Sequence, residues 1–186
     1  KSAKDESLDH NLAISLISRS KNKGVPVSDA KDSLISEIER SYNKELKHLN
    51  AVDFDDLLIL AVQVLRENKD VINFWRERFK YITVDEFQDT NKQQMELVRL
   101  LSGTEQNVCV VGDDDQSIYG WRGAEISNIL EFERFFKSPK VITLEQNYRS
   151  NQAILHTANS SILNNSGRRE KSLWSEKSSS DSVRII

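Results

Sequence analysis

Three carboxylates stand at the end of an apolar run in the stretch "YITVDEFQDT", residues 81–90. Asp85 and Glu86 follow the run directly, and Asp89 comes shortly after them. In open α/β sheets, ligands bind beyond the carboxyl ends of the strands. An Asp in that place can hold Mg²⁺, which takes carboxylate oxygens, water and substrate phosphates, and an adjacent Glu can activate an attacking water. The alternative is that these acids are solvated turn residues.

Two later apolar runs also end in polar groups. The run in "NVCVVGDDDQ" leads to Asp113, and the run in "KVITLEQNYRS" leads to Glu145. If all three runs are parallel strands of one sheet, their carboxyl ends share one edge. We therefore expect Asp113 and Glu145 to lie near Asp85 and Glu86. This arrangement is typical of a nucleoside triphosphatase site with its Mg²⁺.

The stretch "QSIYGWRGA" carries aromatic and basic residues of a different kind. Tyr119, Trp121 and Arg122 are interrupted by Gly120 and Gly123, which favours a loop or a bent entry to a helix. Large aromatic side chains on such a loop can stack on nucleic-acid bases, at about 1–3 kcal/mol for each base. The alternative is that they pack against a neighbouring domain.

The elements that position these residues follow from the apolar pattern. Short continuous apolar runs near residues 81–84, 107–113 and 140–145 predict strands covered on both faces, as in a parallel sheet. Residues 91–101 and 124–136 predict helices between them. The order strand, helix, strand, helix, strand indicates an open α/β sheet, in which residues 81–84 are buried.

Helices are also expected before and after this unit. From Lys31 the apolar positions recur every four residues, as in an amphipathic helix, and Ser28 is a candidate cap for it. Residues 52–68 predict a helix capped by Asp53. The remaining expectations are a polar N-terminal part with a loop at 20–29, helices at 71–79 and 150–165, and a surface loop at 175–182.

Composition limits the protein class. The chain has 186 residues, 38% hydrophobic and 30% charged, so a packed core is expected rather than wholesale disorder. A net charge of −3 confines any nucleic-acid surface to a local groove. The single cysteine, Cys109, excludes an intramolecular disulfide and is expected to be a core residue, and the three histidines lack metal-ligand spacing. No apolar run approaches the roughly 20 residues of a membrane span.

Four motifs, in this order and spacing, carry a resemblance to a known family. "VDFDDLL", "VDEFQDTN", "VGDDDQSIYGWRGA" and "LEQNYRS" closely resemble the UvrD/Rep/PcrA family of superfamily 1 DNA helicases. The resemblance implies an ATP-dependent DNA helicase that moves 3′-to-5′ and is built of RecA-like P-loop motor domains. It implies ATP and Mg²⁺ as cofactors, and single-stranded DNA and duplex/single-strand junctions as partners. Localisation would be cytoplasmic in a bacterium, and nuclear or organellar in a eukaryote.

The resemblance also implies roles for individual residues at the nucleotide. Asp85 resembles the Mg²⁺-binding acid, and Glu86 beside it resembles the general base that activates water. Gln116 resembles the glutamine that senses the γ-phosphate. Tyr148 resembles the aromatic that packs on adenine, and Arg149 resembles an arginine finger that reaches the γ-phosphate.

Further roles concern DNA and the orientation of the site. Gln88 and Asp89 are interpreted as residues that orient the acids. The residues that resemble DNA contacts of the family are Tyr119, Trp121, Arg122 and Phe54.

One family motif has no counterpart in this sequence. The P-loop, "GxxxxGK[ST]", cannot be formed by any pair among the six glycines. The resemblance therefore implies an internal fragment that is inactive by itself. Residues 1–50 would end a helical insertion, residues 51–140 would form the second half of a first motor domain, and residues 141–186 would open a second one. Two alternatives stay open: a subunit of a recombination helicase–nuclease, and a catalytically dead single-stranded-DNA-binding module.

Overall fold

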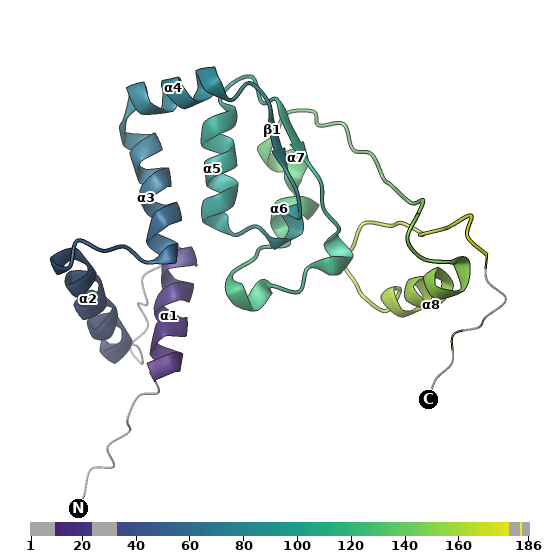
Figure 1. The fold of residues 1–186 in the computed structure, drawn as a ribbon, viewed down its shortest axis with the longest axis horizontal. Helices are drawn as coiled ribbons and strands as arrows, with labels where there is room; N and C mark the ends of the chain where they lie inside the picture. The colour runs from purple at the N-terminus through teal and green to yellow at the C-terminus, as the bar shows by residue number, and fades with distance from the viewer. Residues whose placement is uncertain (1–9, 24–32, 179–182, 184–186) are drawn as a thin grey trace, which may run out of the picture.

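The computed structural model describes residues 10–23, 33–178 and 183, and it is mixed α/β with mostly helices. Figure 1 shows three parts in a row: a group of helices, a small sheet with its own helices, and at the far end the single helix α8 with the irregular chain that leads to and from it. The helices and strands are α1 (His10–Lys23), α2 (Ser33–His48), α3 (Phe54–Glu67), α4 (Lys69–Arg78), β1 (Ile82–Val84), α5 (Lys92–Ser102), β2 (Val108–Val110), α6 (Ser127–Leu130), α7 (Phe132–Phe135) and α8 (Gln152–Ile162).

The two strands are parallel, as the sequence predicts. Ile82 pairs with Val108 and Val84 pairs with Val110, and α5 is the connection between the strands. Because the strands are parallel, their carboxyl ends lie at the same edge of the sheet. The predicted proximity of the acids after β1 to Asp113 after β2 is therefore confirmed by the topology.

The core lies on one face of this sheet. Phe87, Met95, Val98 and Phe136 are buried, and the partly buried side chains of both strands and of α6 and α7 pack against them. The expectation of strands covered on both faces is wrong. Successive strand residues point to opposite faces, and no described helix covers the second face, so Thr83 and Cys109 are exposed. Cys109 is thus not a core residue.

The third predicted strand does not form. Residues 140–145 leave the sheet and cross toward α8 (Figure 1), and Ile142 and Leu144 are 66% and 77% exposed. A strand needs a neighbouring strand to pair with, and residues 140–145 have none among the described residues. The first backbone pairing in this segment begins at Glu145 and Gln146. Trp174 makes a parallel bridge with Gln146, and its backbone N–H donates to the carbonyl oxygen of Glu145 at 3.0 Å. The prediction of a third strand at residues 140–145 is therefore wrong for the described structure.

The helix expected over residues 124–136 is also divided. It is replaced by α6 and α7, two short helices separated at Glu131, whose φ of −111° and ψ of 24° are not helical. Phe132 and Phe135 of α7 pack against the buried cluster that contains Phe87. Phe132 contacts the Phe87 ring edge-on, with the ring centroids 5.7 Å apart.

The helices before and after the sheet agree better with the sequence. The predicted helices at α2, α3, α4 and α8 are present, and Asp53 caps α3 by accepting from the Asp56 N–H at 2.8 Å. The expected polar loop at 20–29 is wrong for its first residues, because α1 continues to Lys23. The cap expected at Ser28 lies outside the described residues. No helix in the described part of the chain is long and apolar enough to cross a membrane.

Candidate functional site: the edge after the two strands

The end of β1 is a strained turn that exposes two carboxylates. Glu86 has φ 51° and ψ 43°, the left-handed region that a non-glycine residue occupies at a cost of order 1–3 kcal/mol. The turn is stabilised locally, because Asp85 Oδ1 accepts the Glu86 N–H at 2.9 Å. Both side chains are exposed, so a cation could reach them from solvent. Such outliers gather at ligand sites, and here the strain fixes where the two acids stand.

Gln88 connects the two strand ends. Its side chain is 1% exposed, and its amide nitrogen donates to Glu86 Oε2 at 2.8 Å. Its amide oxygen accepts the Asp113 N–H at 3.0 Å. Gly112 permits this close approach, because a Cβ there would lie 2.6 Å from Gln88 Oε1. The buried amide therefore holds the acid after β1 in register with the backbone after β2.

Asp113 binds the next candidate residue, Gln116. The Gln116 amide nitrogen donates to Asp113 Oδ2 at 2.6 Å, and the side chain of Gln116 is otherwise exposed. Burial alone would raise the pKa of Asp113, but hydrogen bonds from Lys171 and Gln116 hold it below its usual value. Asp113 therefore stays ionised and keeps Gln116 at the same edge as Glu86.

The acids at this edge fit a Mg²⁺ ion that is shared between protein carboxylates, water and substrate phosphates. No group of three or more His, Cys, Asp or Glu residues in the described chain could enclose a metal. Mg²⁺ commonly uses one or two carboxylates together with water and substrate phosphates, and Asp85 and Glu86 supply that number. Asp89 Oδ1 is buried without a hydrogen-bond partner among the described residues. A buried carboxylate oxygen without a partner fits a site that further donors or a cation complete.

The aromatic loop lies open to solvent. Trp121 is 74% exposed and Tyr119 is 39% exposed. The Arg122 guanidinium lies over both rings, 4.7 Å from the Trp121 centroid and 5.7 Å from the Tyr119 centroid. The three side chains thus form one exposed surface of two π-faces and a cation, which is suited to stacked bases and phosphate.

Phe54 and this loop are joined through Asn22. Phe54 begins α3 and is 91% exposed. Asn22 is buried and donates to Asp55, the residue after Phe54, at 2.8 Å, while accepting from the Asn91 amide at 2.7 Å. A Cβ on Gly123, at the end of the aromatic loop, would lie 3.4 Å from the Cβ of Asn22. Asn22 therefore links the start of α3, the start of α5 and the loop.

A buried lysine attaches α1 to the same helix. Lys21 Nζ contacts Asp53 at 2.7 Å and Asp56 at 2.8 Å. Burial alone would lower the pKa of Lys21, but its hydrogen bonds to the two carboxylates raise it. Burial alone would raise the pKa of Asp53, but the hydrogen bond from Lys21 lowers it. The pair keeps α1 fixed against the residues that precede Phe54.

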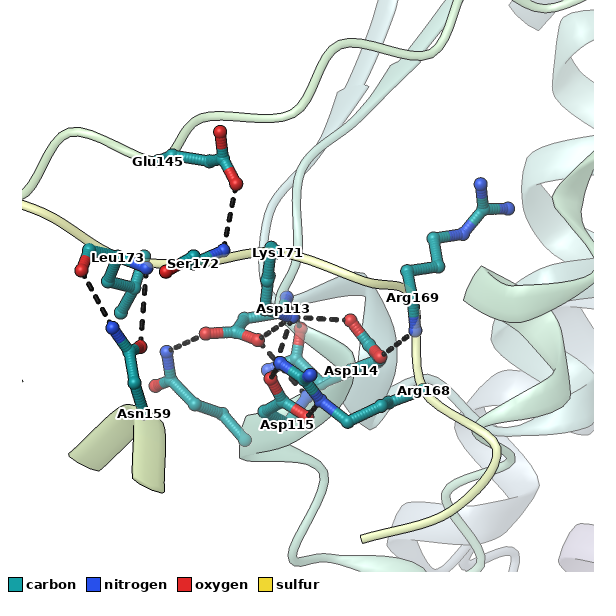
Figure 2. A network of polar contacts seen from close by, with 12 residues as sticks. Asp113, Asp114, Asp115, Glu145, Asn159, Arg168, Arg169, Lys171, Ser172 and Leu173 are labelled. Atoms are coloured by element: carbon teal, nitrogen blue, oxygen red, sulfur yellow. Dashed lines mark hydrogen bonds and ion pairs between the residues drawn. The ribbon is translucent and has the colours of Figure 1, made fainter. Parts of the chain in front are cut away.

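Tyr148 and Arg149 stand on a separate segment. Both side chains are exposed, and the Tyr148 hydroxyl donates to Gln146 Oε1 at 2.8 Å. The Arg149 backbone N–H donates to Asn147 Oδ1 at 2.9 Å, as part of the turn that precedes α8. Within the described residues no hydrogen bond or ion pair joins them to Asp85 or Glu86. Glu145, which was expected at the sheet edge, instead accepts the Ser172 N–H at 2.8 Å (Figure 2).

The comparisons with known proteins agree with the motifs. A family model described as the UvrD/REP helicase N-terminal domain matches residues 2–137. The chain belongs to the UvrD/Rep helicase family. It is 44% identical over 156 residues to proteins named ATP-dependent DNA helicase PcrA from Staphylococcus epidermidis and Staphylococcus aureus. Those matches cover 84% of this chain and 21% of each relative, so the chain spans about a fifth of the length of the relatives.

In this UvrD/Rep-family chain, the sequence did not indicate that Asn22, Arg168 and Lys171 would lie at the candidate site. Asn22 stands in a stretch that was expected to be a loop, and nothing in its spacing marks it. Arg168 and Lys171 contact the acids after β2 but come from the polar stretch after α8. The run "GRREK" was a signal, because three cations close together suit the three acids of "GDDDQ". Only the tertiary structure brings the two runs together.

Proposed function

We propose that the complete protein is an ATP-dependent DNA helicase or translocase of the UvrD/Rep type that moves 3′-to-5′ on single-stranded DNA. The observation that carries this proposal is the bond of Gln88 to both Glu86 and Asp113, beside an exposed aromatic loop. A nucleotide site at this edge and a base-stacking surface on the same small unit would allow ATP hydrolysis to be coupled to movement on DNA. The PcrA name of the relatives supports the same activity.

At the edge after β1 and β2, Asp85 would hold Mg²⁺, and the bound ion would neutralise phosphate charge. Glu86 would take the proton of an attacking water, and its strained backbone and the Gln88 amide fix the position of its carboxylate. Gln116, held by Asp113, would contact the γ-phosphate. Tyr148 would pack on adenine, and the Arg149 guanidinium would bind phosphate oxygens as charge develops on them.

On the DNA side, Trp121 and Tyr119 would stack on bases, and Arg122, whose guanidinium lies over both rings, would bind phosphate. Phe54 would add a further stacking face, since it is almost fully exposed at the start of α3. Stacking of this kind tolerates any base sequence, because every base has a π-face. Duplex/single-strand junctions are the proposed substrate, and the sheet edge would bind ATP.

The proposed domain division follows the family. Residues 1–50 would end a helical insertion, residues 51–140 would belong to a first RecA-like motor domain, and residues 141–186 would open a second. The family match to residues 2–137 and the departure of residues 140–145 from the sheet support a boundary near residue 140. For a bacterial protein the proposed localisation is cytoplasmic.

The test is unwinding by the complete protein of a duplex with a single-stranded tail at either end. We expect ATP-dependent unwinding of the 3′-tailed duplex and little unwinding of the 5′-tailed one. Trp121→Ala is the matched variant, and it should lose unwinding while ATP binding remains. Binding of single-stranded DNA without any ATP turnover would instead support the dead binding module, and degradation of the strands would support the helicase–nuclease.

A further inference from the structure

Lys171 contacts all three acidic residues that follow β2. Its Nζ lies 2.6 Å from Asp113 Oδ1, 2.6 Å from Asp114 Oδ1 and 3.1 Å from Asp115 Oδ2 (Figure 2). The side chain of Lys171 is only 12% exposed. Burial alone would lower its pKa, but the three hydrogen bonds raise it, so the ammonium stays charged. It is a cation at the centre of a largely buried acidic turn.

The neighbouring arginines complete this contact. The Arg168 guanidinium donates two hydrogen bonds to Asp115, at 2.7 and 2.6 Å, and the backbone N–H of Arg169 donates to Asp114 Oδ2 at 2.8 Å. Hydrogen bonds from Arg168 lower the pKa of Asp115 despite its burial. Residues 168–171 therefore form a fixed docking segment on the turn after β2.

The docking segment is also fixed to the part of the chain that carries Tyr148 and Arg149. The Asn159 side chain of α8 exchanges two hydrogen bonds with the Leu173 backbone, at 2.8 and 3.2 Å (Figure 2). Trp174 then pairs with residues 145–147, directly before Tyr148. A displacement of Tyr148 and Arg149 would therefore move Lys171 as well.

From Lys171 a continuous path of short polar contacts leads to Glu86. Lys171 binds the Asp113 carboxylate, the Asp113 N–H donates to Gln88 at 3.0 Å, and Gln88 donates to Glu86 at 2.8 Å. A branch of the path reaches Gln116, which shares Asp113 with Lys171 at 2.6 Å. The path from Lys171 thus ends at Glu86 and its branch ends at Gln116, and the proposed function places both of these residues at the nucleotide.

We propose that Lys171 is a positioning residue for Glu86 and Gln116 and that it acts through Asp113. Lys171 thereby couples the segment that bears Tyr148 and Arg149 to the hydrolytic edge, which is the proposed nucleotide site formed by the residues after β1 and β2. The inference rests on the proposed ATP hydrolysis. With Lys171 withdrawn, the Asp113 carboxylate would lose its ion pair at 2.6 Å and would keep only neutral hydrogen-bond donors, the Asp115 N–H and the Gln116 amide. Asp113 would turn away, and the Gln116 and Gln88 contacts would shift with it.

The experiment compares steady-state ATP hydrolysis, with and without single-stranded DNA, in the complete protein and four variants. Lys171→Met removes the cation, Lys171→Arg restores it, and Arg134→Met removes a surface ion pair, Arg134–Glu131 at 2.7 Å, as the control. The double variant Lys171→Met with Asp114→Asn removes one charge of each sign. It keeps the local charge balance and protects the fold, while Asp113 still lacks its cation.

We expect kcat to fall about 10-fold to 100-fold in Lys171→Met, as for other misplaced catalytic groups. ATP affinity should stay within about twofold, because Asp85 and Tyr148 are unchanged. The charge-balanced double variant should keep the low kcat, Lys171→Arg should recover much of it, and Arg134→Met should match the wild type. The split between kcat and affinity separates positioning from a loss of folded protein.

Recovery of kcat in the double variant would overturn the inference, because Lys171 would then only balance charge. So would a wild-type kcat in Lys171→Met, or equal losses of kcat and ATP affinity. Absence of any ATP turnover in the wild-type complete protein would instead overturn the proposed function, and the inference with it.

Discussion

Alanine at position 112 should disturb the edge after β1 and β2 more than the small size of the added methyl group suggests. A Cβ on Gly112 would lie 2.6 Å from Gln88 Oε1, 2.8 Å from Ile129 Cδ1 and 3.1 Å from the backbone nitrogen of Phe87. The three atoms surround the new methyl group, and Gln88 has no free space because it is 1% exposed. The methyl group therefore has to displace Gln88, α6 or the turn after β1.

The magnitude follows from two contributions. Extra volume in a packed interior costs about 1–3 kcal/mol. Moving Gln88 away also breaks its bond to the Asp113 N–H, a net loss of about 1 kcal/mol for a hydrogen bond of this kind. The sum is roughly 2–4 kcal/mol, which corresponds to roughly 30-fold to 700-fold in a local opening equilibrium at 1.4 kcal/mol for each factor of ten.

Native-state hydrogen exchange of peptides covering residues 84–113 measures that opening directly. Gly120→Ala is the matched control, since a Cβ there meets no atom within 4 Å of the described structure. We expect faster exchange in Gly112→Ala and unchanged exchange in Gly120→Ala. Exchange in Gly112→Ala that stays within about 0.5 kcal/mol of the wild type, as for a neutral surface substitution, would refute the packing argument.

Three further results are expected. Trp121→Ala should weaken single-stranded DNA binding by about 1–3 kcal/mol for each lost stack and leave ATP affinity unchanged; equal losses of both affinities would make Trp121 a packing residue. Arg149→Ala should slow ATP turnover more than it weakens ATP binding, and the reverse pattern would make Arg149 a ground-state contact. In the folded protein the pKa values of Asp113 and Asp115 are lowered. The two ionised carboxylates therefore add to the free energy of unfolding above their unfolded pKa of about 3.9, and this contribution is lost as the pH falls through their folded pKa values. Thermal unfolding against pH should show this loss below about pH 4, and a smaller loss in Asp115→Asn.

The sequence predicts the shared edge after β1 and β2 because that edge depends on local order. A short apolar run followed by acids predicts a strand and its carboxyl end, and two such runs around a helix predict that Asp85 and Asp113 share an edge. Asp53 was recognised as a cap because capping depends on residues three positions apart. The family motifs add roles for Glu86 and Gln116 that spacing alone cannot assign.

What the sequence could not predict depends on tertiary contacts. The β-branched run at residues 140–145 suits a strand anywhere, and only a partner edge decides which sheet it joins. The side of β2 on which Cys109 lies depends on which face the helices cover. The contact of Lys171 with Asp113 joins residues 58 positions apart, and no local pattern reports it. Such long-range ion pairs become visible only when the fold is known.

The proposal that the edge after β1 and β2 hydrolyses ATP in response to DNA leads to a clear expectation for Glu86→Gln. ATP turnover by the complete protein should rise with single-stranded DNA. In Glu86→Gln it should fall by about 10²–10⁴-fold, because the amide cannot accept the proton of water, while ATP and Mg²⁺ still bind. Turnover in Glu86→Gln close to that of the wild type, with or without DNA, would contradict the claim.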